Sequence, residues 1–315
     1  MVDNFKDLRI VFMGTPEFAV ASLDALVKVG CNIVGIITAP DKQAGRGLQL
    51  QQSAVKKYAV ENNLHILQPE KLKDPAFIEA LKELKADVQA VVAFRMLPEI
   101  VWDMPPLGTI NVHGSLLPQY RGAAPINWAV INGEKFTGVT TFKLQQEIDT
   151  GNILLSEKIA IEEDDNAGTV HDKLKEVGAA LLVKTILLVA DDKLVEIPQQ
   201  ESAEEIKHAP KLFTETGNID WNKNVEEIYN LIRGLSPYPV AYTKLHSKVL
   251  KIFAGEKLLD KPDISPGTFK TDGKNFLQFA GANGYINVTT IQLEGKKKME
   301  IKEFLRGYRF PKTVT

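Results

Sequence analysis

The chain has 315 residues, 44% of them hydrophobic and 25% charged, which is ordinary for a soluble globular protein and enough for two domains. A single cysteine, Cys31, excludes an intrachain disulfide, and no apolar run reaches the length of a membrane span, so we expect a cytoplasmic protein without membrane contact. The formal net charge of −2 conceals a basic C-terminal third and an acidic remainder. That asymmetry favours a polyanionic partner for the C-terminal part, with a solvated basic surface as the alternative.

The first half of the chain alternates strands and helices. Apolar runs at 8–13 and 32–38 predict strands, and helical spacing at 17–29 joins them into a βαβ unit of a mostly parallel sheet. Helices at 53–63 and 75–85 and a buried strand at 87–94 continue the pattern. The turn after the first strand has one glycine and lacks the dinucleotide-binding fingerprint, which argues against a nicotinamide oxidoreductase.

The connection at 39–48 is longer than most in a compact α/β domain. Lys42 and Arg46 stand there among glycines, which allow a close backbone approach and suit a phosphate backbone as partner. A flexible surface loop without a ligand is the alternative. If the loop serves RNA, we expect it to be mobile until Lys42 and Arg46 are engaged.

A polar pair defines the candidate site. Asn111 and His113 are two residues apart in a strand predicted at 107–114, so both side chains point to one face, and the strand then gives way to a loop. Ligand sites of open α/β sheets lie at such strand ends. A second loop, between strands predicted at 138–144 and 153–161, carries Asp149, which we expect to fold back on His113. An exposed polar strand face is the alternative.

The C-terminal part has a different organisation. A long amphipathic helix is predicted at 169–189, a polar linker at 191–210, and a new domain over 211–315. Its five short alternating runs, punctuated by glycine and proline, predict a small β-barrel of the class that includes the oligonucleotide-binding fold. We therefore expect a catalytic domain over 1–190 and an RNA-binding domain over 211–315.

Several motifs carry a resemblance to a known family. They are the segment at 12–19, the loop at 40–47, the run Asn111-Val112-His113-Gly114-Ser115-Leu116-Leu117-Pro118, the segment at 121–126, Asp149-Thr150-Gly151, and the Gly-Lys-Lys run at 295–297. With them the chain closely resembles the methionyl-tRNA formyltransferase family over essentially its whole length. The resemblance implies a Rossmann-like catalytic domain, a C-terminal barrel, 10-formyltetrahydrofolate as formyl donor, and initiator methionyl-tRNA as acceptor. The histidines lack the spacing of metal ligands and the acyl donor is already activated, so we expect no metal, and we expect a monomer.

The resemblance assigns residues to three roles. The catalytic set is Asn111, His113 and Asp149; the folate-binding set is Phe94, Arg95, Met96, Ser115, Leu116, Leu117 and Pro118; the tRNA-binding set is Lys42, Arg46, Lys296, Lys297 and Lys298. Two departures from the family pattern concern the 94–98 segment, which is one residue shorter than usual, and Lys42, which replaces an arginine. A lysine offers a point charge where arginine offers a planar fork.

The chemistry of formyl transfer suits the three catalytic residues. An amide such as that of Asn111 donates to the oxygen that becomes negative in a tetrahedral intermediate. His113 exchanges a proton near neutrality, and Asp149 orients the imidazole and stabilises its cation. Formyltransferases acting on glycinamide ribonucleotide or on amino sugars share such a set, but the first lacks a basic C-terminal domain and the second usually adds a dehydrogenase domain. A non-catalytic RNA-binding module is a further alternative, against which the intact trio argues.

Overall fold

The computed structural model describes residues 4–44, 49–199 and 205–310, which form two compact units. The first comprises residues up to Pro125 together with Thr137–Ile159 and His171–His208. The second comprises Ile126–Phe136, Ala160–Val170 and the chain from Ala209 onward. Two short segments that are enclosed in sequence by parts of the first unit thus belong to the unit that contains the C-terminus.

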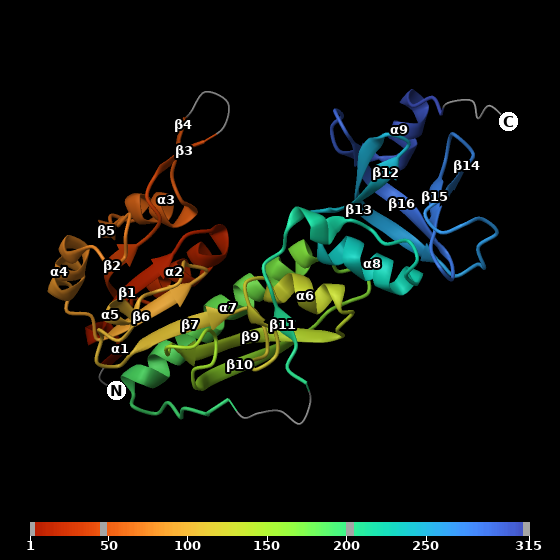
Figure 1. The fold of residues 1–315 in the computed structure, drawn as a ribbon. Coiled ribbons are helices and arrows are strands. Elements are labelled where there is room, and N and C mark those ends of the chain that lie inside the picture. The colour runs from red at the N-terminus through yellow and green to blue at the C-terminus, as the bar shows by residue number, and fades with distance from the viewer. Residues whose placement is uncertain (1–3, 45–48, 200–204, 311–315) are drawn as a thin grey trace. The chain divides into compact units, whose positions relative to one another are not determined.

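A seven-stranded sheet in the order β10-β9-β7-β6-β1-β2-β5 forms the frame of the first unit (Figure 1). Its strands are β1 (Arg9–Gly14), β2 (Asn32–Ile37), β5 (Ile66–Leu67), β6 (Val88–Val92), β7 (Thr109–His113), β9 (Phe136–Lys143) and β10 (Ile153–Ala160). The pairings from β5 to β7 are parallel, and β9 joins β7 antiparallel. This confirms the predicted α/β class with a mostly parallel sheet.

The helices up to residue 190 include those predicted from the spacing of apolar residues. They are α1 (Asn4–Asp7), α2 (Glu17–Lys28), α3 (Ala54–Glu61), α4 (Pro75–Glu83), α5 (Glu99–Trp102), α6 (Pro125–Ile131) and α7 (Ala167–Ala190). The two four-residue helices α1 and α5 were not predicted. Ser53 caps α3 by accepting a hydrogen bond from the Lys56 amide, and Asp74 caps α4, which begins with a proline. Apolar side chains of α4 and the strands β1 and β6 share one buried cluster. Burial of that face, more than intrinsic propensity, stabilises such short helices.

The strand order opens a crevice at the carboxyl end of β7, the strand that carries Asn111 and His113. The chain runs outward from β1 to β2 and β5 on one side, and returns to β6 and β7 on the other. The carboxyl ends of β6 and β7 therefore open next to the switch point, where ligands bind in open α/β sheets. Gly14 ends β1 there, and a β-carbon on it would lie 2.6 Å from the β-carbon of Ala19. Only glycine allows this close packing of strand end and helix.

The connection at 39–48 is partly regular. Residues Lys42–Ala44 (β3) and Gln49–Gln51 (β4) pair antiparallel as a small hairpin, and positions 45–48 lie outside the described residues. Asp41 at its base accepts hydrogen bonds from Lys56 Nζ and from Gln68 Nε2 (2.9 Å). The expectation of an irregular loop over the whole connection was therefore wrong for its two ends, which form strands. These strands were not predicted because their residues show no alternation of apolar and polar side chains.

The second unit is built on a six-stranded antiparallel sheet. It contains β12 (Ala241–Leu245), β13 (Lys248–Leu258), β16 (Tyr285–Leu293), β15 (Leu277–Ala280) and β14 (Phe269–Thr271) in that order, and β17 (Met299–Glu300) pairs with β16. The sheet is curled like part of a barrel, and in the described part of the chain its outer strands β12 and β14 do not pair with each other. The five predicted strands are all present, whereas the two-residue β17 was not predicted.

Helices cover one side of that sheet. The amphipathic α8 (Val225–Gly234) places Val225, Ile228 and Ile232 in the core of the second unit, and α9 (Ile301–Gly307) adds Phe304 and Leu305. Trp221 stacks on Phe279 with ring centroids 4.9 Å apart. The remaining short elements of the chain are β8 (Arg121–Gly122), β11 (His208–Ala209) and the 3₁₀ turn Thr214–Gly217.

Candidate active site

The central strand β7 brings Asn111 and His113 to the crevice. It lies between β6 and β9, so its backbone groups are taken up by strand pairing, and Asn111 and His113 are the polar side chains at its carboxyl end. The Asn111 side chain is half-buried and makes no hydrogen bond with the described residues. Both of its amide hydrogens are thus free to meet a ligand.

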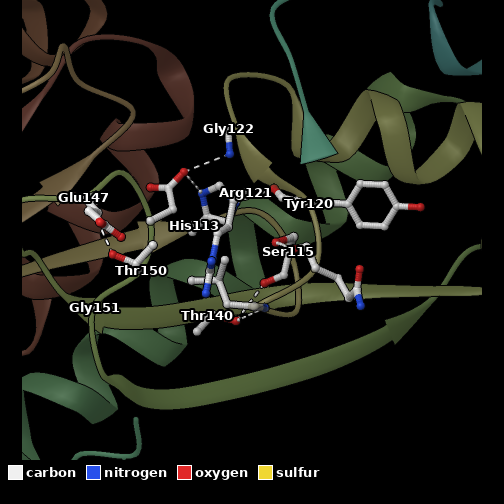
Figure 2. A network of polar contacts seen from close by, with 12 residues as sticks. His113, Ser115, Tyr120, Arg121, Gly122, Thr140, Glu147, Thr150 and Gly151 are labelled. Carbon is white, nitrogen blue, oxygen red and sulfur yellow. Dashed lines mark hydrogen bonds and ion pairs between the residues drawn. The ribbon is translucent and has the colours of Figure 1, made fainter. Parts of the chain in front are cut away.

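His113 is held in one orientation. It is only 6% exposed, its Nε2 lies 2.9 Å from the backbone oxygen of Tyr120, and Phe142 meets it edge-on. Since a carbonyl oxygen only accepts, Nε2 carries the hydrogen and Nδ1 is the nitrogen that gains or loses a proton. Nδ1 faces Asp149 Oδ2 at 3.8 Å (Figure 2). The pair becomes an ion pair when Nδ1 is protonated.

Asp149 occupies a tight turn between β9 and β10. Its φ of +55° is a left-handed conformation that aspartate tolerates better than most residues. A β-carbon on Gly151 would lie 1.6 Å from the Lys143 backbone oxygen, so this position admits only glycine. The Asp149 carboxylate is largely buried and accepts a hydrogen bond from the Gly122 amide at 2.9 Å. The loop with Asp149 thus folds back on His113, as predicted from the sequence, and the loop with Gly122 meets it there.

Gln199 ties those two loops together and was not singled out in the sequence. Its Nε2 donates to the backbone oxygens of Asp149 (2.9 Å) and Gly151 (2.8 Å), and its Oε1 accepts from Arg121 Nη2 at 2.6 Å. The residue lies in the segment predicted as a linker, whose polar composition hid this role. Paired backbone bonds between Ile197 and Ile153, both 2.8 Å, hold that segment against β10.

A cavity of about 390 Å³ opens beside these groups, and Asn111, Gly122 and Asp149 line it. Its apolar side is formed by Val91, Phe94, Leu97, Trp102, Leu144 and Ile148. A pocket of this size and lining suits a flat ring system, with a few polar groups fixing its orientation. The structure therefore brings Asn111 and Asp149 to a ligand-sized cavity, and His113 adjoins it through Asp149.

The residues predicted to bind folate divide into two groups. Phe94, Arg95 and Met96 line the cavity, whereas the lining includes none of Ser115, Leu116, Leu117 and Pro118. Ser115 is fully buried, donates to the Gln119 backbone oxygen at 2.6 Å, and accepts a bond on its own backbone oxygen from Thr140 (Figure 2). These bonds shape the turn after β7 that presents the Tyr120 oxygen to His113.

The residues predicted to bind tRNA are described in part. Lys42 is exposed on β3, and Arg46 lies outside the described residues. Lys296, Lys297 and Lys298 are all exposed between β16 and β17. Lys298 Nζ lies 4.4 Å from the centre of the Phe253 ring, and Lys297 Nζ lies 3.9 Å from Glu303. The three lysines therefore form one basic edge of the second unit.

Three further properties concern residues outside the candidate site. Burial raises the pKa of the Cys31 thiol to about 11, which fits a structural rather than a nucleophilic cysteine. In the described part of the chain no three histidine, cysteine, aspartate or glutamate side chains gather as a metal site would require. Likewise, none of the described helices is both long and apolar enough to cross a membrane.

Fold and site together have the features of an enzyme class, because a Rossmann-like sheet carries an amide, an imidazole and a carboxylate at its switch point. Models of the formyl transferase domain and of the formyl transferase C-terminal domain match residues 8–186 and 211–309. The chain belongs to the formyl transferase family. It is 55% identical over 310 residues to the methionyl-tRNA formyltransferase of Bacteroides fragilis, covering 96% of each chain, and 56% identical over 313 residues to that of Phocaeicola vulgatus, covering 96% of this chain and 97% of the relative.

Solved structures show the same fold at lower identity. WlaRD, a sugar 3N-formyl transferase crystallised with dTDP and 5-N-formyl-THF, is 20% identical with a TM-score of 0.68, covering 92% of this chain and 99% of its own. HypX from Aquifex aeolicus, in complex with tetrahydrofolic acid, is 17% identical with a TM-score of 0.65, covering 95% of this chain and 48% of its own. The family assignment confirms the formyltransferase predicted from the sequence motifs.

Proposed function

We propose that the chain transfers the formyl group of 10-formyltetrahydrofolate to the α-amino group of methionine esterified to initiator tRNA. The convergence of Asn111 and the His113–Asp149 pair beside one ring-sized cavity is the observation that carries this proposal. The names of the relatives that are more than half identical over nearly their whole length support tRNA as the acceptor.

The reaction exchanges one bond and one proton. The amine nitrogen attacks the formyl carbon, and the carbonyl oxygen becomes negative in the tetrahedral intermediate. The bond from carbon to the folate N10 then breaks, the amine loses a proton, and N10 gains one. The protein must therefore stabilise an oxyanion and move a single proton across the site.

The side chains fit these two tasks. The free amide of Asn111 donates to the oxyanion, a role worth about 3–4 kcal/mol in comparable sites. His113 receives the amine proton on Nδ1, because Nε2 is occupied by the Tyr120 oxygen, and returns it to the leaving nitrogen. Asp149 stabilises the transient imidazolium at 3.8 Å, so proton capture and ion-pair formation coincide.

The ring system of the co-substrate matches the size and the apolar lining of the cavity. Its planar pterin ring would lie among Phe94, Leu97, Trp102 and Ile148, with the formyl-bearing nitrogen toward Asn111. Arg95 and Met96 stand at the outer end of that cavity. The segment Ser115, Leu116, Leu117 and Pro118 would serve the site through the turn that fixes His113, in addition to the folate contact that its motif predicts.

Further assignments belong to the same proposal. The catalytic domain would span 1–190 and the tRNA-binding domain 211–315, with 191–210 as the connection between them. The protein would act as a cytoplasmic monomer. Lys42, Arg46 and the basic edge of Lys296, Lys297 and Lys298 would contact the tRNA backbone.

The direct test is formyl transfer from 10-formyltetrahydrofolate to three acceptors. Charged initiator tRNA should be formylated, while free methionine and charged elongator methionyl-tRNA should react far more slowly. Release of tetrahydrofolate and retention of the formyl group on the tRNA should be measured together. Equal rates with all three acceptors would refute tRNA selection, and absence of transfer to any of them would refute the proposed reaction.

A further inference from the structure

A second and larger cavity, of about 1,020 Å³, adjoins the ring-sized one within the first unit. The two share Arg95, Met96, Leu97, Trp102 and Gln146 in their linings. We refer to the 390 Å³ cavity as the inner cavity and to the larger one as the outer cavity. Because a cavity of about 300–1,000 Å³ holds a drug-sized ligand, the outer cavity has room for much more than the ring that fills the inner one.

Two unpaired cations stand on the wall of the outer cavity. Lys71 and Lys73 are exposed, and neither ammonium group has a hydrogen-bond or ion-pair partner in the described part of the chain. Leu72 between them is 8% exposed and packs into the core formed with α4. This anchor fixes the backbone of the short segment, so both lysines remain at the cavity whether or not it is filled.

Arg95 adds a third positive charge that is already oriented. Its guanidinium donates to the backbone oxygens of Glu70 (2.8 Å) and Pro69, and it has no carboxylate partner in the described residues. These bonds tie the 94–98 segment to the 69–73 segment, which keeps the two walls of the outer cavity together. Arginine remains charged at any physiological pH.

The cavity also has an apolar surface and two acidic groups. Met96 is 71% exposed and Ile100 54% exposed, and both line it. The carboxylates of Glu70 and Glu99 stand at its border. A ligand that matches this lining has an apolar part, which packs against Met96 and Ile100, and well-separated negative charges, which pair with the three cations. A phosphate backbone is a poorer match, because its charges are densely spaced and it offers no comparable apolar part.

We infer that the outer cavity binds the oligoglutamate tail of the folate co-substrate, with Lys71 and Lys73 pairing with the carboxylates of glutamates beyond the first. The inference rests on the proposed function, which places the pterin ring in the inner cavity. The aminobenzoyl group then lies along Met96 and Ile100, and each γ-linked glutamate extends the chain toward the two lysines. The site therefore selects donors by the length of their glutamate tail.

The test compares binding of 5-formyltetrahydrofolate carrying one or three glutamates to the full-length protein, using calorimetry at low and high salt. The triglutamate should bind about 3- to 10-fold more tightly, since individual exposed ion pairs are weak. That advantage should shrink at high ionic strength and disappear in Lys71→Gln/Lys73→Gln. The matched control, Lys82→Gln/Lys85→Gln, removes two exposed lysines outside the cavity and should retain it.

Each outcome separates the two proposals. Equal affinity of the wild-type protein for the two ligands, or a triglutamate advantage that survives in Lys71→Gln/Lys73→Gln, overturns the glutamate site while leaving the proposed function intact. Failure of both ligands to bind the wild-type protein refutes the proposed function itself. If the double variant loses affinity for tRNA but keeps the triglutamate advantage, the outer cavity serves RNA and the inference is wrong.

Discussion

The side-chain amide of Gln199 donates a 2.9 Å hydrogen bond to the backbone oxygen of Asp149, the residue whose carboxylate faces His113. The same amide reaches Gly151, and its oxygen accepts from Arg121. The turn that holds Asp149 in its left-handed conformation is therefore fixed from a segment 50 residues later in the chain. If Asp149 serves the reaction as we propose, Gln199 is a positioning residue that acts through Asp149.

Replacing Gln199 by Ala should lower kcat about 10- to 100-fold, because misplacing a catalytic group by about 1 Å has a cost of this order. Gln199→Glu should be at least as harmful, since it keeps the Arg121 contact but turns a carboxylate toward two carbonyl oxygens. The measurement is steady-state formyl transfer with thermal unfolding alongside.

A double-mutant cycle with Asp149→Ala provides the control for Gln199. If Gln199 acts only by placing Asp149, adding Gln199→Ala to Asp149→Ala should lower kcat little further. Gln278→Ala, at a half-buried glutamine on β15, should leave kcat near that of the wild type. Additive losses in the cycle would show that Gln199 supports the fold rather than the carboxylate.

Asn111→Ala and His113→Ala should each lower kcat by at least about 100-fold, the low end for loss of an oxyanion donor or a general base. The measurement is kcat for formyl transfer to charged initiator tRNA at saturating formyl donor. Turnover close to the wild-type value in either variant would refute its assignment.

Much of the frame was predictable because its signals are local. Apolar runs marked β1, β2 and β6, and a capping serine and a proline marked the starts of α3 and α4. Strand alternation likewise placed Asn111 and His113 on one face of β7. These elements depend on residues adjacent in the chain, so the sequence contains the information directly.

The features that were not predicted from the sequence depend on contacts between residues far apart in the chain. The Gln199 side chain forms hydrogen bonds with Arg121 and Asp149, which precede it by 78 and 50 positions. Its neighbours in the sequence are polar and give no signal of these contacts. Segments 126–136 and 160–170 belong to the second unit because of contacts with residues much later in the chain. One example is the 2.8 Å hydrogen bond from the Asn127 side chain to the Gly234 backbone oxygen. The outer cavity is formed by segments from three parts of the chain. None of these relations leaves a periodic signal.

Cys31 should resist thiol reagents in the native protein. Burial raises the pKa of its thiol to about 11, so at pH 8 the reactive thiolate is scarce, whereas an unfolded cysteine with a pKa near 8.5 is partly ionised. Labelling with an aromatic disulfide should be slow in the folded protein and fast in denaturant. Because the folded pKa is the higher one, stability should fall as pH rises between those two values, and less so in Cys31→Ala. Rapid native labelling would contradict the buried placement.

Neutralising Lys296, Lys297 and Lys298 together should weaken tRNA binding and flatten its salt dependence. If each lysine meets one phosphate, the slope of log K against log salt should decrease by up to about two to three units. The lysine at 296 should contribute most, because its ammonium group has no partner in the described part of the chain, whereas Lys297 lies near Glu303. Neutralising the exposed Lys82, Lys85 and Lys184 of the first unit provides the control. An unchanged slope in the first triple variant would place the RNA surface elsewhere.

The hairpin of β3 and β4 should contribute discrimination among tRNAs. Lys42 is exposed at its start, and Asp41 is fixed by the ammonium of Lys56, whose hydrogen bond also lowers the pKa of that carboxyl. The anchored base fixes the position of Lys42, and Arg46, which lies outside the described residues, is the second cation predicted to contact the tRNA. Opening a weak or mismatched end of an acceptor stem costs about a few kcal/mol less than opening a fully paired one. A basic hairpin that enters the opened end would therefore favour the tRNA whose acceptor stem opens most easily.

Replacing Lys42 and Arg46 by Ala should therefore reduce kcat/KM for initiator methionyl-tRNA far more than it slows hydrolysis of the formyl donor by water. Lys42→Arg should retain most of the tRNA activity, because it keeps the charge and adds a planar fork. Both reactions are measured on one preparation, so loss of folding would lower them equally. If the two activities fall in parallel in a double variant that unfolds at the same temperature as the wild type, the hairpin supports the folate site and does not select the tRNA.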